Sequence, residues 1–161
     1  MKISNIFIAA IFLLHFGCIK EDSTIYKANL INQTSHQITI LPYKKGVINK
    51  KDSIFLNPGD NFEIANGYIR GLIDKPFFST EYFAIEQGDS IVVFFDKTFP
   101  IVHYNYILPQ KLFIKNYLRD SNRNLNNREG SYKFDTKATS KHQRHNQHTY
   151  TFTEQDYLDA K

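Results

Sequence analysis

The sequence contains one cysteine, one methionine and no tryptophan. A single cysteine cannot form a disulfide within the chain, so packing alone must stabilise the fold. Hydrophobic residues nevertheless make up 42% of the 161 residues, with 10 tyrosines and 14 phenylalanines among them. This composition excludes a disordered chain and suffices for the core of one domain, and its aromatic and β-branched residues favour sheets over helices.

Long apolar runs are also missing, apart from a short one near the N-terminus. Ile6 to Leu14 are nine uninterrupted apolar residues that follow the basic Lys2. A helix of this length spans only about 13 Å, less than half of a hydrocarbon core of about 30 Å, so the run is too short for a membrane span. It is typical of the apolar part of a signal peptide, and the alternative is a buried N-terminal strand or helix.

The short motifs of common catalytic sites are absent. The sequence has no G-x-S-x-G, no H-E-x-x-H and no glycine-rich loop for binding phosphates or dinucleotides. We therefore expect no enzyme and no cofactor; a new site assembled from distant residues is the alternative.

The residues around the single cysteine resemble a bacterial lipoprotein signal. Phe16 and Gly17 lead to Cys18, after which the chain becomes charged; His15 stands where the common pattern has an aliphatic residue. The resemblance implies that residues 1–17 are a signal peptide, cleaved between Gly17 and Cys18, and that Cys18 is acylated, for example with palmitate. Several acyl chains anchor a protein stably, since each buried methylene contributes about 0.8 kcal/mol.

The residues after the cysteine suggest the cellular location to which the protein is sent. Lys20, Glu21 and Asp22 are similar to the lysine-plus-two-acids tag that directs lipoproteins of Bacteroidetes-type bacteria to the outer face of the outer membrane. An ordinary solvated tether is the alternative. We expect residues 18–24 to form a lipidated tether, in which Ser23 resembles the acceptor for O-glycosylation of exported proteins in the same bacteria.

The rest of the chain alternates short β-prone runs with turn signals. Ile25–Ile31 and His36–Tyr43 flank the turn-prone residues 32–35 and predict a hairpin. Similar runs recur at roughly ten-residue spacing between Pro-Gly, Gly-Asp and Asn-Gly turns. This rhythm predicts an all-β fold, an antiparallel β-sandwich of short strands, with residues 25–161 as a single domain.

Basic residues concentrate in one polar stretch, about residues 119–149, whose net charge of +4 equals that of the whole chain. We expect a polar loop region here. Its cations, Arg123, Arg128, Lys141 and Arg144, could bind a polyanion, which for an exported protein means an acidic glycan or lipopolysaccharide rather than nucleic acid. The alternative is a merely solvated loop.

Three histidines in this stretch, His142, His145 and His148, recur every third residue. Histidine is the commonest nitrogen ligand, so the three could meet on a metal ion if the segment curled. On an extended strand His145 points away from the other two, and the adjacent Arg144 repels a cation. We therefore expect a solvated loop, with a metal site as the alternative.

The C-terminal segment predicts a last strand and a short helix. Thr153 can cap a helix in which Asp156 occupies the third position, as in an approximate capping box. This ending, together with the Arg-Asn segment and the Ser-Tyr pair before it, is similar to the closing pattern of small uncharacterised Bacteroidetes lipoproteins, which implies no activity. The matching positions are Arg123, Asn124, Ser131, Tyr132, Tyr150, Phe152, Thr153, Asp156 and Tyr157.

Together these features predict a monomeric lipoprotein of the outer membrane, anchored in the lipid bilayer through Cys18 and exposed to the periplasm or the cell surface. We expect a non-catalytic binding or accessory role, with glycans or envelope proteins as partners. One alternative is a periplasmic enzyme or inhibitor with a pocket near the His-rich segment. Another is a structural subunit that joins an envelope complex through a sheet edge.

Overall fold

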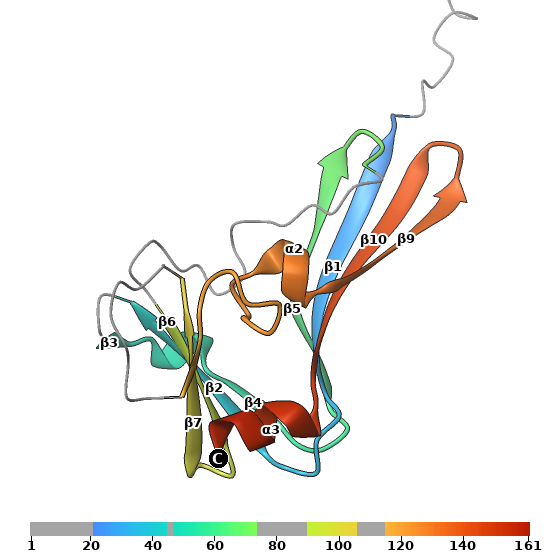
Figure 1. Cartoon of the computed structure of the whole chain (residues 1–161). Coiled ribbons are helices and arrows are strands. Elements are labelled where there is room, and N and C mark those ends of the chain that lie inside the picture. The colour runs from blue at the N-terminus through green and yellow to red at the C-terminus, as the bar shows by residue number, and fades with distance from the viewer. Residues whose placement is uncertain (1–20, 45–46, 74–89, 106–114) are drawn as a thin grey trace, which may run out of the picture.

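The chain folds into two β-sheets that share one core, with a short helix at the C-terminus (Figure 1). The computed structural model describes residues 21–44, 47–73, 90–105 and 115–161. Within these residues, four strands form one sheet and six form the other. The predicted all-β sandwich with a C-terminal helix is confirmed. None of the described helices is long and apolar enough to cross a membrane.

The four-stranded sheet joins the first strand of the domain to the last. Its strands, in order across the sheet, are β5 (Asn61–Arg70), β1 (Ser23–Asn32), β10 (Gln143–Phe152) and β9 (Lys133–Ser140). β1 and β10 run parallel, whereas the two outer pairs are antiparallel. A parallel pair needs a long connection, and here the chain between the two strands, which contains the six-stranded sheet, provides it. The sandwich is therefore mixed rather than purely antiparallel.

The six-stranded sheet is built around an antiparallel trio, β2, β6 and β7, with shorter strands at its edges. β8 pairs with β7 in parallel, and both β3 and β4 pair with β2. The bounds are β2 (Ile38–Lys44), β3 (Val47–Ile48), β4 (Ile54–Leu56), β6 (Ser90–Phe95), β7 (Phe99–Tyr104) and β8 (Asn116–Tyr117), with the 3₁₀ turn η1 (Lys50–Asp52) before β4.

The core lies between the facing sides of the two sheets. Side chains alternate across a strand, so β6 places Ile91, Val93 and Phe95 inward, all fully buried. From the opposite sheet, Phe152 meets Phe95 edge to face, with ring centroids 6.4 Å apart and planes at 81°. Such aromatic pairs contribute about 0.5–1.5 kcal/mol beyond the burial of their area. The pair joins the last strand of the chain to the centre of the other sheet.

The hairpin predicted around residues 32–35 is wrong, because β1 and β2 belong to different sheets. The buried Asn32 side chain organises this crossing between the sheets. It donates to the carbonyl oxygens of His36 at 2.8 Å and Leu56 at 3.3 Å, and accepts from the Thr34 N–H at 3.0 Å. Both strands bury an apolar face against the shared core instead of pairing with each other.

About half of the polar stretch of residues 119–149 is sheet, which corrects the predicted loop. β9 and β10 form an antiparallel hairpin that turns at Lys141 and His142. Short turns and the helix α2 (Arg128–Ser131) occupy the residues before β9. The stretch is polar because almost every residue of β9 is exposed, not because it lacks regular structure.

The C-terminal helix α3 (Glu154–Ala160) begins at its predicted cap. The Thr153 N–H donates to Asp156 Oδ2 at 2.7 Å, and the two residues form the capping box that the sequence indicates. The ring of Tyr157, in the same helix, packs 5.9 Å from that of Phe95. The helix therefore closes one end of the core.

Some of the positions that match the closing pattern of the sequence contact one another beside this helix. Arg123 forms an ion pair with the buried Asp156, and its guanidinium lies 5.1 Å from the centre of the Tyr150 ring. The Tyr150 hydroxyl in turn donates to the Arg123 carbonyl oxygen at 2.8 Å. Asn124, fully buried, donates to the carbonyl oxygens of Tyr104 and Tyr117, each at 2.8 Å. In this chain these contacts link the turns before α2 to β10 and α3.

Candidate functional site

Most of the predicted lipidation signal, including Gly17, Cys18 and Lys20, lies outside the described residues. The described chain begins at the end of the four-stranded sheet that extends away from the six-stranded sheet (Figure 1). We call this the open end of the four-stranded sheet. It comprises the start of β1, the end of β5 and the β9–β10 turn.

Two acidic residues of the predicted export tag contact the domain at the open end. Asp22 Oδ1 lies 2.8 Å from His142 Nδ1, and the Asp22 carbonyl oxygen accepts from the Gly71 N–H at 2.7 Å. Glu21 lies 3.5 Å from the guanidinium of Arg70. These contacts fix where the polypeptide enters the sheet.

The predicted boundary of the tether is two residues too late, because β1 begins at Ser23. Ser23 is only 7% exposed, and it pairs with Arg70 on one side and Gln143 on the other. The adjacent Thr24 is fully buried and donates to the Gly71 carbonyl oxygen at 2.7 Å. The folded chain therefore does not present Ser23 as a glycosylation acceptor in a tether.

The three histidines do not meet. His142 lies in the turn beside Asp22, whereas His145 and His148 lie in β10, one exposed and the other fully buried. This alternation is the one expected of an extended strand. Across the described ranges of the chain, no three His, Cys, Asp or Glu side chains form a group that could hold a metal ion.

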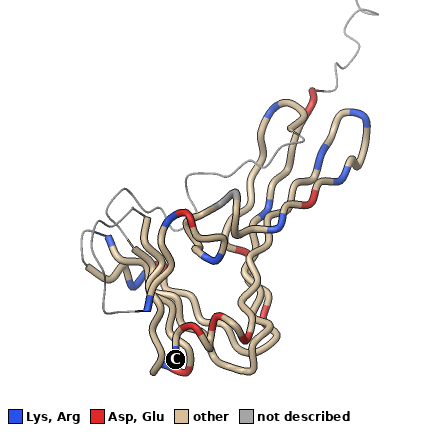
Figure 2. Tube along the Cα trace, in the orientation of Figure 1, with Lys and Arg blue, Asp and Glu red and all other residues tan. Residues whose placement is uncertain are grey.

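The four cations predicted to bind a polyanion are also dispersed. Arg123 faces Asp156 at the helix end of the molecule, and Arg128 belongs to α2. Lys141 lies in the β9–β10 turn, where Arg144 donates to the Ser140 carbonyl oxygen at 3.2 Å. Figure 2 shows Lys and Arg spread along this hairpin. They do not form the single patch that the sequence suggested.

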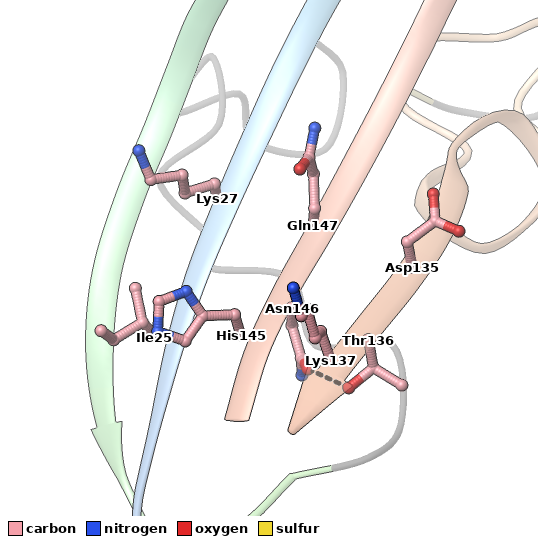
Figure 3. A pocket seen from close by; sticks show the side chains of 8 residues that line it. All are labelled: Ile25, Lys27, Asp135, Thr136, Lys137, His145, Asn146 and Gln147. Atoms are coloured by element: carbon pink, nitrogen blue, oxygen red, sulfur yellow. Dashed lines mark hydrogen bonds between the residues drawn. The ribbon is translucent and has the colours of Figure 1, made fainter. Parts of the chain in front are cut away.

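A groove of 330 Å³ crosses the exposed face of the four-stranded sheet near the open end (Figure 3). Its volume falls at the lower end of the range of ligand pockets, about 300–1,000 Å³. Three neighbouring strands supply side chains to it: Ile25 and Lys27 from β1, His145 and Gln147 from β10, and Asp135 and Lys137 from β9.

Register places these side chains in two rows that run across the strands. In the first row, Tyr68 lies opposite Ile25, Ile25 opposite His145, and His145 opposite Lys137. Figure 3 shows the His145 ring extending from β10 toward Ile25. Residues opposite one another point to the same face, so Tyr68, which is 58% exposed, continues this row beyond the groove.

The second row contains Asn66, Lys27, Gln147 and Asp135. Lys27 donates to Glu63 of β5 at 2.9 Å, and this hydrogen bond lowers the pKa of the Glu63 carboxyl. Asp135 pairs with Lys133 at 3.1 Å. The charges of this row are thus compensated within the sheet.

Lys137 differs, because no carboxylate in the described part of the chain lies within ion-pair distance of it. It stands opposite His145 in the first row. The groove therefore offers one uncompensated cation beside an imidazole.

Two polar side chains hold the groove in shape. Thr136 Oγ1 donates to Asn146 Oδ1 at 2.8 Å, and Asn146 Nδ2 donates to the Ile73 carbonyl oxygen at 2.8 Å. Asn146 is only 2% exposed, so both its hydrogen bonds are sheltered from water. The wall between β9 and β10 is accordingly preformed rather than assembled on binding.

No protein-family model, curated protein or solved structure matches this chain. Its function is therefore inferred from the geometry of the described residues.

Of the predicted site residues, only His145 lines the groove; Ile25, Lys27, Tyr68, Lys137 and Gln147 were not predicted. The alternation of Ile25 and Lys27 with inward residues could have indicated an exposed face on one strand. Nothing local indicates that this strand lies beside β10, more than a hundred residues later. The site was missed because it depends on that pairing.

Proposed function

We propose that this protein is a lipid-anchored lipoprotein of the outer membrane with a non-catalytic binding role at the cell envelope. The observation that supports a binding role most directly is the groove on the four-stranded sheet. It combines an apolar residue, an amide, an imidazole and charged side chains on one face, as ligand sites commonly do.

The character of the groove favours binding over catalysis. His145, Gln147 and Lys137 are exposed side chains on an open face. Catalytic groups act in sites from which water is excluded, where electrostatic interactions are stronger. A solvated face of this kind suits reversible recognition of a polar ligand.

The position of the groove agrees with anchoring through Cys18. The chain enters the domain through Asp22, beside the groove at the open end of the sheet. A tether attached there would hold the binding face near the membrane surface.

Mass spectrometry of the mature protein from its native host tests the anchor. We expect an N-terminal Cys18 whose mass includes a diacylglycerol and an amide-linked acyl chain, and recovery of the protein in the outer-membrane fraction. A retained Met1 or an unmodified Cys18 would refute anchoring.

A second candidate function is a periplasmic enzyme or inhibitor, since His145 and Asp135 both line the groove. Incubation of the protein with a bound ligand distinguishes the two. A binding protein returns the ligand with unchanged mass, whereas an enzyme converts it.

A further inference from the structure

We propose that the exposed face of the four-stranded sheet binds an acidic saccharide, with Tyr68 as the stacking surface and Lys137 as the group that recognises a carboxylate. This inference rests on the proposed binding role of the face. It adds the chemical class of the ligand and the two residues that determine it.

The first row provides a path for a chain of sugar rings. Tyr68, Ile25, His145 and Lys137 occupy four adjacent strands. Neighbouring strands lie about 4.8 Å apart, so the row extends about 14 Å across the sheet. A short oligosaccharide laid along it would contact the aromatic ring at one end and the cation at the other.

Tyr68 has the properties of a stacking surface. It is 58% exposed although it belongs to a ten-residue strand whose neighbours on the same face are mostly polar. A tyrosine ring offers a large apolar area with few rotatable bonds, and its hydroxyl can also form hydrogen bonds. An exposed ring beside the apolar Ile25 suits the C–H face of a pyranose.

The charges on this face favour an acidic ligand. Lys27 is neutralised by Glu63, and Asp135 by Lys133, so the pairs of the second row have little net charge to offer. Lys137 is the cation of the groove without such a partner among the described residues. A ligand carboxylate at this position gains an ion pair with Lys137, which at an exposed site strengthens binding about two- to fivefold.

A saccharide fits this face better than an acidic peptide. Peptides that bind sheets usually extend them at a free edge, where backbone groups are unpaired. The groove instead lies on the face of the sheet, over β1, β10 and β9, and among the described strands only β9 of these three has an unpaired side. The groups that it presents include an amide, an imidazole, the unpaired cation of Lys137 and the paired charges of Lys27 and Asp135, and Gln147 can bond to sugar hydroxyls.

The test is calorimetric titration of the exported chain with Cys18→Ser, which prevents acylation. The probes are tetragalacturonate and the same tetrasaccharide with its carboxyls reduced to alcohols. We expect the acid to bind about two- to fivefold more tightly than the reduced form. Equal binding of the two, or binding of neither, would overturn the proposal.

Two variants assign the roles. Lys137→Gln should abolish the preference for the acid, whereas Tyr68→Ala should weaken both forms about tenfold. The matched controls are Lys50→Gln and Phe55→Ala, exposed residues near or in the six-stranded sheet, which should change neither affinity. Circular dichroism verifies that each variant is folded.

Unchanged binding in both groove variants would place the ligand elsewhere and overturn the assignment. Tighter binding of a glutamate peptide than of tetragalacturonate would identify an acidic peptide as the ligand class, which also overturns it. Because the titrated protein has no lipid, these outcomes do not depend on whether Cys18 is acylated in the native host.

Discussion

Arg123 donates through Nε to Asp156 Oδ1 at 2.9 Å and so links the turns before α2 to the first turn of the C-terminal helix. Asp156 is 1% exposed and also accepts from the N–H of its own N-cap residue, Thr153. One buried carboxylate therefore both caps α3 and attaches it to the sandwich. This double role explains why so short a helix is fixed in place.

Arg123→Met should be strongly destabilising, because it leaves the Asp156 carboxylate buried without its cation. Removal of one partner from a buried pair costs about 3–5 kcal/mol. We expect about 3 kcal/mol here, since Arg123 itself is partly exposed. Urea unfolding measures the loss.

Lys133→Met is the matched control, because its pair with Asp135 is largely exposed. Exposed pairs contribute less than about 1 kcal/mol, so the control should change stability little. Similar losses in the two variants would contradict the role assigned to Arg123.

Asn32→Ala should destabilise the crossing between the sheets. It leaves the Leu56 carbonyl and the Thr34 N–H without the side chain that bonds to them. Each unsatisfied buried group costs about 1–3 kcal/mol, so the free energy of unfolding should fall by at least about 2 kcal/mol.

Asn29→Ala provides the comparison on the exposed face of the same strand. Its Nδ2 donates to Asn61 Oδ1 at 2.8 Å in an exposed hydrogen bond, and we expect a loss below about 1 kcal/mol. If Asn32→Ala is equally mild, the crossing is stabilised by packing rather than by Asn32.

Stability should decrease in acid because of His103. This side chain is 1% exposed, and its Nδ1 accepts from the Leu125 N–H at 2.9 Å. Burial, assisted by the positive charge of Arg123, lowers the pKa of His103 from 6.5 to about 3. Between these values the unfolded chain binds a proton that the folded chain does not. Stability is therefore full above pH 6.5 and is lost as the pH falls toward 3, by up to about 1.4 kcal/mol per pH unit.

His103→Asn preserves an acceptor for the Leu125 N–H and removes the titrating ring. Urea unfolding at several pH values should show a flatter dependence for this variant than for the wild type. His145→Asn, a change to an exposed histidine, should retain the wild-type dependence. An unchanged slope in His103→Asn would assign the acid sensitivity to other groups.

Gly67→Ala should destabilise the four-stranded sheet. Gly67 lies opposite Tyr26, and a Cβ at this position would overlap the tyrosine ring. Displacement of the ring should cost about 1–3 kcal/mol. In a double-mutant cycle, Tyr26→Ala should relieve this cost, so that the two changes together destabilise less than their sum. Strict additivity would show that the ring does not restrict Gly67.

The all-β class and the C-terminal helix could be predicted because their signals are local. Alternating residues such as Ile91, Val93 and Phe95 specify a strand with one buried face, and Thr153 with Asp156 specifies a helix start. Pairing is not local. The turn after β1 was placed correctly, but whether it folds back or crosses to another sheet depends on Asn32 and the distant Leu56.

Of the candidate site, only the polar composition of its strands could be predicted from the sequence. The polar residues of β9 and β10 suggested a loop, because a strand that is exposed on most of its surface has the same composition as a solvated segment. Their residues form a groove only through the parallel register between β1 and β10, which joins Ile25 to His145. No spacing within either strand contains that information.

If Cys18 is acylated as proposed, the contacts of Asp22 with His142 and Gly71 limit how far the proposed binding face can be from the bilayer. Asp22 lies four positions after Cys18, a reach of at most about 14 Å. Lys27 lies five positions beyond Asp22, about a further 17 Å along the chain. An acylated Cys18 would thus hold the groove within reach of head groups and their attached sugars. Such a protein would bind saccharides of the membrane in which it is anchored, rather than polymers in the surrounding medium.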